Sequence, residues 1–284
     1  MLDAFAPYPL CKTTTNNTFL SLESAALIPI RSPAEIDSIR AACTIVHSVQ
    51  MALEAAVVPG VSTQQLDELA EATIRDQGGV PAFKGYCDFP ASICASINAE
   101  AVHGFPRPSP LNDGDVVCVD VGVKLDGWFG DGAFTIGVGN ISPEVRQLLS
   151  TTRASLDAGI EAFVPGGRLT DISHAVELAA LAGGATVIRE YGGHGIGRSL
   201  HEDPHILNYG PANRGPRLKV GHVFAIEPIL SLSSADVEVA DDGWTTVTTD
   251  GSIATHFEHT VALTSDGPVT LTLPVGQPAV GVPA

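Results

Sequence analysis

The chain has few basic residues and no long apolar run. Lys and Arg together number 15 among 284 residues, against 32 Asp and Glu, so the formal net charge is −17 and the pI is near 4.7. This charge disfavours sequence-independent binding to nucleic acid or to an anionic membrane surface. No stretch is long and apolar enough to cross a bilayer, so a membrane-spanning protein is not expected.

Cysteines are also few, and their spacing shows no pairing. The five cysteines form no CxxC motif and are odd in number, which argues against a thiolate zinc site and a disulfide framework and favours reduced thiols in a cytoplasmic protein. The first 20 residues have no basic region followed by an apolar core, so no signal peptide is expected. A hydrophobic fraction of 44% and a charged fraction of 17% fit a globular chain with a sizeable core.

Hydrophobic periodicity divides residues 32–273 into two similar halves. An extension (1–31) precedes them and a Pro/Gly-rich tail (274–284) follows, and the extension and the tail are expected to be partly flexible. Capping boxes open helices at Ser32 and Ser62, and glycines end them near 60 and 78. The second half is expected to repeat this order of two helices followed by strands. Helices are expected at 142–163 and 170–181, and strands at 92–98, 116–125, 134–138, 187–191, 222–229, 244–248 and 256–263.

Five ionisable side chains lie in segments that are typical of buried strands or glycine-rich loops. They are Asp120 in VVCVDVGV, Asp131 in WFGDGAF, His194 in YGGHGIG, Glu227 in VFAIEPIL and Glu258 in HFEHTVAL. A buried carboxylate costs several kcal/mol unless a cation or hydrogen bonds compensate it, and no Lys or Arg is near in the sequence. Carboxylate oxygens with one imidazole suit divalent Mn, Fe, Co or Zn. Four carboxylates would balance two such ions, so a dinuclear hydrolytic centre is predicted.

These motifs closely resemble those of the type I methionine aminopeptidases over residues 32–273. The matching segments, in the order of that family, are SINAEAVHGFP, DVVCVDVGV, GWFGDGAFTIGVG, YGGHGIGRSLHEDP, FAIEPI, DDGWTTVTTDGS and HFEHTVAL. The resemblance implies the α/β "pita-bread" fold, with two pseudo-symmetric helix-helix-β-hairpin halves around a curved, mostly antiparallel sheet. It also implies that residues 32–273 are one metallo-aminopeptidase catalytic domain. The long insertion of the type II enzymes between His194 and Glu227 is missing.

The resemblance implies a metal-dependent enzyme that removes the initiator methionine when the second residue is small. Two divalent ions (Co, Mn, Fe or Zn, the identity undetermined) would be held by Asp120, Asp131, His194, Glu227 and Glu258. Asp131 and Glu258 would bridge the ions, Asp120 would bind one of them, and His194 and Glu227 would complete the other site. Glu227 would also be the general base for a metal-bridging hydroxide that attacks the scissile carbonyl.

The same resemblance assigns the residues that would contact the substrate. His201 would stabilise the oxyanion, and His103 would orient the scissile peptide. The apolar methionine pocket would be lined by Phe83, Tyr86, Phe89, Cys94, Leu200 and Trp244. Phe83 and Leu200 depart from the commoner family choices, which leaves the pocket's finer selectivity open.

The expected partner is the N-terminal Met-Xaa of nascent polypeptides. Residues 231–250 contain no Lys or Arg, so a basic hairpin that could approach ribosomal RNA is missing there. Weak ribosome association through another surface stays open, and no nucleic-acid specificity or membrane binding is expected. A monomer is expected.

Two alternatives and several simpler interpretations remain at this stage. An Xaa-Pro peptidase of the same fold usually has a large N-terminal domain and extra histidines near its site, and a non-catalytic binding module typically loses ligands, whereas all five are present here. His259 is expected to point away from Glu258 and to be structural, and His205 to lie on the surface. Solvated charges are expected at Glu202, Asp203, Asp241 and Asp242.

Overall fold

The computed structural model describes residues 28–274. Residues 1–27 and 275–284 lie outside the described residues, and with them most of the expected extension and the tail. Within 28–274, no helix is long and apolar enough to span a membrane.

Among the described residues, four α-helices form where the capping motifs and periodicity predict them. They are α1 (Pro33–Ala56), α2 (Thr63–Asp76), α3 (Pro143–Ala162) and α4 (Leu169–Ala182). The capping box of α1 is formed, since the Ser32 backbone N–H donates to Glu35 at 2.9 Å and the Glu35 N–H donates to the Ser32 hydroxyl. Ser62 and Gln65 make the same exchange at the start of α2.

The strands are short, apart from one long hairpin. In the first half they are β1 (Val80–Pro81), β2 (Ile93–Ile97), β3 (Glu100–Val102), β4 (Val116–Leu125) and β5 (Trp128–Gly137), with a 3-10 turn η1 at Tyr86–Asp88. In the second half they are β6 (Thr186–Val187), β7 (Gly192–Gly195), β8 (Glu202–Leu207), β9 (Val223–Ile226), β10 (Ile229–Ser231), β11 (Val237–Val239), β12 (Thr246–Thr248), β13 (Ala254–His256), β14 (His259–Thr264) and β15 (Gly267–Thr270).

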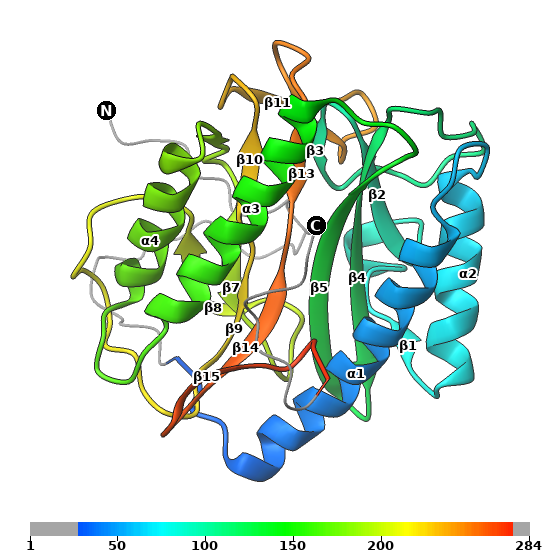
Figure 1. Ribbon diagram of the computed structural model, residues 1–284. Coiled ribbons are helices and arrows are strands. Elements are labelled where there is room, and N and C mark those ends of the chain that lie inside the picture. The colour runs from blue at the N-terminus through cyan, green and yellow to red at the C-terminus, as the bar shows by residue number, and fades with distance from the viewer. Residues whose placement is uncertain (1–27, 275–284) are drawn as a thin grey trace, which may run out of the picture.

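The strands lie between the two helix pairs (Figure 1). Helix α1 packs on β4 and β5, and α3 packs on β9, β10 and β13 of the other half. The ladders between named strands are antiparallel. The expected two-half α/β architecture is therefore confirmed. The ladders form several short sheets rather than one continuous sheet.

The two halves meet between β5 and residues 256–260. The Glu258 backbone N–H donates to the Ala133 carbonyl at 2.9 Å, and the Thr260 hydroxyl donates to the Asp131 carbonyl at 2.8 Å. These contacts bring the charged positions of the first half against those of the second.

Several strand expectations were wrong in detail. The strand expected at 134–138 begins at Trp128, and of the expected strand 187–191 only Val187 lies in a strand. The expected strands 222–229 and 256–263 are each interrupted, at Glu227-Pro228 and at Phe257-Glu258, and Pro228 has no N–H to give to a ladder. The glycine-rich segment expected as a loop forms β7. There a Cβ on Gly193 would lie 2.3 Å from the Ala225 carbonyl oxygen, so only glycine allows β7 to lie this close to β9.

The cysteines follow the sequence expectation only in part. Cys43, Cys94 and Cys118 are buried free thiols. Cys87 is disulfide-bonded, so the expectation of reduced cysteines is wrong for this residue.

A buried histidine outside the charged cluster makes folding sensitive to acid. Burial lowers the pKa of His222 to about 4, with a smaller contribution from the Lys219 ammonium, and its Nδ1 accepts a hydrogen bond from the Lys219 backbone N–H. The unfolded chain binds a proton here below pH ~6.5, so stability is present at neutral pH and is lost as the pH falls from there toward 4.

We expect His222→Asn, which keeps an acceptor close to the Nδ1 position, to unfold less readily in acid. The free energy of unfolding lost between pH 7.5 and pH 5 should be smaller in the variant by about 2 kcal/mol. Urea titrations at the two pH values measure this difference. An equal loss in both proteins would show that His222 does not titrate in this way.

Candidate active site

The first pair of carboxylates lies on the long hairpin. In the β4–β5 ladder Asp120 faces Ala133 and Gly122 faces Asp131, so the two aspartates are diagonal neighbours on one face of the sheet. Asp131 is 3% exposed, and its backbone N–H donates to the Thr260 hydroxyl at 3.1 Å. The strand pairing thus carries both aspartates to the junction between the halves.

The second pair lies in the interrupted ribbon of the other half. Ile226 pairs with His259 in one ladder and Ile229 pairs with His256 in the next. Glu227 and Glu258 therefore occupy facing positions in the gap between the two ladders. The interruption leaves the two carboxylates at the centre of the molecule, and Glu258 is 2% exposed.

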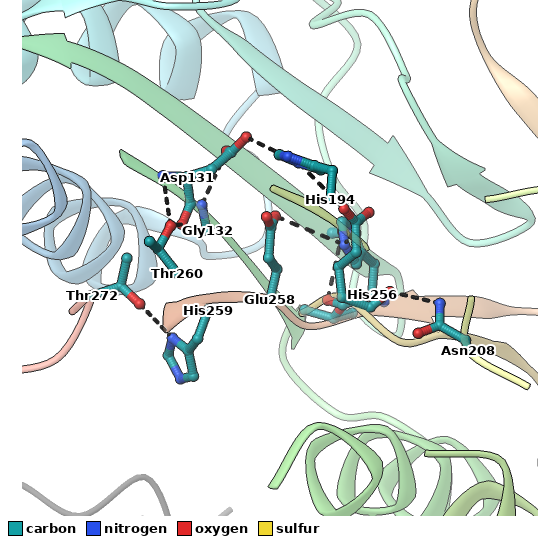
Figure 2. A network of polar contacts seen from close by, with 12 residues as sticks. Asp131, Gly132, His194, Asn208, His256, Glu258, His259, Thr260 and Thr272 are labelled. Atoms are coloured by element: carbon teal, nitrogen blue, oxygen red, sulfur yellow. Dashed lines mark hydrogen bonds and ion pairs between the residues drawn. The ribbon is translucent and has the colours of Figure 1, made fainter. Parts of the chain in front are cut away.

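His194 comes from β7 and completes the cluster. Its Nδ1 lies 2.9 Å from the Gly195 carbonyl oxygen, which can only accept, so Nδ1 carries the proton and Nε2 carries the lone pair. That Nε2 lies 3.5 Å from Glu227 Oε1. It also lies 3.9 Å from Asp131 Oδ2 (Figure 2). Burial lowers the pKa of His194 to about 4, so the ring is neutral at pH 7 and can act as a ligand.

Burial makes this cluster costly without a cation. It raises the pKa of Asp120 to about 7. It raises the pKa of Asp131, Glu227 and Glu258 well above their ordinary values, and the neighbouring carboxylates raise each of these further. Within residues 28–274, no Lys or Arg forms an ion pair with any of the four.

The donor set fits a divalent metal ion. Asp131, His194 and Glu258 each offer one ligand atom, and these atoms lie within 4.8 Å of one another. Asp120 Oδ1 and Glu258 Oε1 are buried without a hydrogen-bond partner, and buried polar atoms normally have one. Oxygens with one imidazole nitrogen are the donors that Mn, Fe, Co and Zn accept.

His256 is a neighbour of this cluster that the sequence interpretation missed. Its Nε2 lies 3.6 Å from Glu227 Oε2. The same nitrogen lies 4.0 Å from Glu258 Oε2 (Figure 2) and has no hydrogen-bond partner. The signal was available, because His256 is two positions from Glu258 and alternation along a strand places such residues on one face. His259, by contrast, points away from the cluster and contacts the Thr272 hydroxyl at 2.8 Å, as expected for a structural residue (Figure 2).

The two predicted substrate histidines lie near the cluster. The ring of His201 is 4.4 Å from that of His194 between centroids, and its Nδ1 lies 2.8 Å from the Tyr86 hydroxyl. His103 is half-buried between Tyr191 and Trp244, and its buried Nδ1 has no hydrogen-bond partner. Burial lowers the pKa of His103 to about 4 and that of His201 well below its usual value, so both rings are neutral at pH 7.

Five of the six predicted pocket residues lie together. Phe83, Phe89, Cys94 and Leu200 are buried in one apolar cluster, and Trp244 packs against it. Tyr86 is not part of this cluster, since it is 38% exposed and its ring contacts that of His201. Cys94 pairs with Asp120 in the β2–β4 ladder, so the pocket adjoins the carboxylates. Phe105 and Phe129 also pack on this cluster and were not predicted.

Glu202 and His205, which follow His201 in the sequence, differ in exposure. His205 is exposed, as expected. Glu202 was expected to be solvated, and this was wrong: its side chain is 13% exposed and pairs with Arg31. The partner of Glu202 is 171 positions away in the sequence, so no local pattern could reveal it.

A two-half α/β fold around a buried carboxylate-imidazole cluster defines a metal-dependent hydrolase. The chain matches the model of metallopeptidase family M24 over residues 37–265. It is 49% identical over 259 residues to methionine aminopeptidase 1 of Mycobacterium tuberculosis (strain CDC 1551 / Oshkosh), and the alignment covers 89% of this chain and 97% of that relative. The chain therefore belongs to metallopeptidase family M24.

Solved structures agree with this placement. The methionine aminopeptidase of Rickettsia prowazekii superposes with a TM-score of 0.86 at 38% identity, covering 87% of this chain and 100% of that one. The prolidase of Pyrococcus furiosus superposes with a TM-score of 0.72 at 23% identity, covering 87% of this chain and 66% of that one. The second likeness concerns the fold alone.

Proposed function

We propose that this protein is a cytoplasmic methionyl aminopeptidase that removes the N-terminal methionine of nascent proteins and peptides when the second residue is small. The observation that carries this proposal is the position of the apolar pocket beside the carboxylate cluster, through the pairing of Cys94 with Asp120. The curated relative with 49% identity bears the name of that activity.

Two divalent ions would be held by Asp120, Asp131, His194, Glu227 and Glu258, and Mn, Co, Fe and Zn all suit this set. When bound, such ions supply Lewis acidity toward a water molecule and toward the scissile carbonyl. The cluster's four carboxylates would balance the charge of two divalent ions. This balance, together with the buried oxygens that lack hydrogen bonds, supports two ions rather than one.

The chain's own residues would bind and orient the substrate and move the proton. The pocket formed by Phe83, Phe89, Cys94, Leu200 and Trp244 would take the methionine side chain, since thioethers pack well on aromatic rings. Glu227 would accept a proton from the attacking water. His103 would orient the scissile peptide, and His201 would donate a hydrogen bond to the developing oxyanion. The Tyr86 hydroxyl beside His201 Nδ1 fixes the direction of that ring.

His201→Ala is expected to lower kcat by roughly 10²–10³-fold while leaving the bound metal unchanged, because one oxyanion donor is lost. His205→Ala is the matched control, since His205 lies on the same segment but is exposed. Steady-state release of methionine and metal analysis by mass spectrometry measure both effects. Equal activity in the two variants would remove His201 from the mechanism.

The proposed function is tested by peptide selectivity. Metal-supplied enzyme should release free methionine from Met-Ala-Ser and at least about tenfold more slowly from Met-Leu-Ser, because loss or gain of a few methylene groups in a narrow site is worth about this much or more. Ala-Pro should not be cleaved. Cleavage of Ala-Pro with no methionine released would instead support an Xaa-Pro peptidase.

We also propose that the enzyme has no strong ribosome contact through residues 231–250, because this segment has no Lys or Arg and cannot release counterions from ribosomal RNA. Co-sedimentation with ribosomes at low salt should therefore be unchanged when Asp241 and Asp242 are replaced by Asn. A strong interaction that depends on this segment would contradict the proposal.

A further inference from the structure

We infer that Arg31 is a positioning residue that holds the substrate-facing loop, residues 196–202, against the rest of the catalytic unit. The inference rests on the proposed function for its effect on activity, but its structural part stands without it. The loop carries Leu200, a wall of the apolar pocket, and His201. The position of this loop therefore determines the shape of the pocket and the placement of the proposed oxyanion donor.

The first link is an ion pair between Arg31 and Glu202 with little exposure. The two side chains are 10% and 13% exposed. Arg31 Nη2 donates to Glu202 Oε2, while Glu202 Oε1 accepts the backbone N–H groups of Arg198 at 2.7 Å and Ser199 at 3.0 Å. One carboxylate thus closes the turn of the loop and ties that turn to Arg31. Charge-assisted bonds of this kind are stronger than neutral ones.

The second link is the ring of Trp128, the first residue of β5. The guanidinium carbons of Arg31 and Arg198 lie 5.5 and 3.6 Å from the centre of this ring, within the range of cation–π contact. The Phe129 backbone N–H donates to the Gly197 carbonyl at 2.9 Å. The loop is therefore attached to the strand that also carries Asp131.

The third link fixes Arg31 itself. Its backbone N–H donates to the Gly221 carbonyl at 2.7 Å, shortly before β9. The space between Arg31 and the loop is filled, since a Cβ on Gly197 would lie 2.5 Å from Arg31 Nη2. Arg31 directly precedes the α1 cap, and it thus joins the turn before β9 to the loop that carries His201. Its role is to order that loop before substrate arrives, which lowers the entropic cost of binding.

Arg31→Ala removes the guanidinium and leaves the Glu202 carboxylate with backbone donors alone. We expect kcat/KM for Met-Ala-Ser to fall by roughly 10–100-fold, because small displacements of positioned groups have effects of this size. Arg31→Lys should recover part of this loss, since an ammonium keeps the charge but not the planar contacts with Trp128 and Glu202. Arg75→Ala is the matched control. Arg75 also pairs with a glutamate, Glu71, but its side chain is 53% exposed on α2.

Hydrogen–deuterium exchange on the full-length, metal-supplied protein gives the readout that is independent of activity. Arg31→Ala and Glu202→Gln should each speed exchange at residues 196–202 and leave α2 unchanged. The double variant should show no more than the larger single effect, because both changes break one contact. Unchanged exchange in this loop, or equal acceleration in α2, would overturn the inference. If the wild type released no methionine but the variants still showed faster exchange in the loop, the proposed function would be overturned. The structural role of Arg31 in holding the loop would still be supported.

Discussion

Removal of divalent metal is expected to abolish methionine release and to lower the temperature at which the protein unfolds. The catalytic effect follows because the side chains of the site alone do not activate water or polarise a peptide carbonyl as two divalent cations do. The stability effect follows because the four buried carboxylates repel one another. A ligand at 100 times its dissociation constant contributes about 2.7 kcal/mol to the folded state.

The stability of the metal-free protein should also depend on pH through Asp120, in a way that the metal-loaded protein does not share. Burial raises the pKa of Asp120 to about 7, whereas the unfolded chain ionises near pH 4. Between these values Asp120 is protonated in the folded state and ionised in the unfolded chain, so the stability that this group contributes is greatest in acid and is lost as the pH rises through 7. From pH 6.5 to pH 8 the loss at Asp120 alone is about 1 kcal/mol.

Thermal unfolding at pH 6.5 and pH 8, with chelator and with Mn, tests this expectation. The chelated protein should unfold at a lower temperature at pH 8 than at pH 6.5, and Mn should raise both values and reduce the difference. Restoration of methionine release should parallel the rise. Full activity after complete removal of metal, or an unfolding temperature indifferent to Mn, would contradict the metal assignment.

Glu227→Gln is expected to lower kcat by about 10²–10⁴-fold, because the amide keeps the shape of the side chain but cannot take a proton from water. The loss should persist at saturating metal, where a simple ligand defect would be overcome. His256 should remain in place beside the new amide, since Glu227 Oε2 and His256 Nε2 are 3.6 Å apart in the wild type.

Metal titration by calorimetry separates the two roles of Glu227. A weaker second binding event with activity restored at high metal would make Glu227 a ligand and not the base. Glu177→Gln serves as the control, because Glu177 pairs with Arg189 at 3.6 Å and is not one of the cluster residues. That variant should keep wild-type kcat.

Local sequence rules predicted the starts of the helices and the strand that carries Asp120. The second strand of the hairpin was expected only at 134–138, whereas β5 begins at Trp128 and also carries Asp131. Ser32 and Ser62 form the capping boxes that their spacing indicates. The alternation in 116–125 predicted β4 with both ends in place. These elements depend on contacts within a few residues, which periodicity records.

The second half of the site depended on contacts that no local pattern records. Glu227 and Glu258 face one another because two ladders are interrupted at the same place, and continuous strands were expected there. The β7 glycines looked like a loop because their close approach to β8 and β9 requires the absence of side chains. Glu202 looked solvated because Arg31, which covers it, lies far away in the sequence.

The most direct test of the account is anomalous scattering from crystals of the Mn-loaded protein. Two peaks should appear inside the ring of Asp120, Asp131, His194, Glu227 and Glu258, and both should vanish after treatment with chelator. A single peak, or peaks away from these five side chains, would contradict the dinuclear centre on which the proposed aminopeptidase mechanism depends.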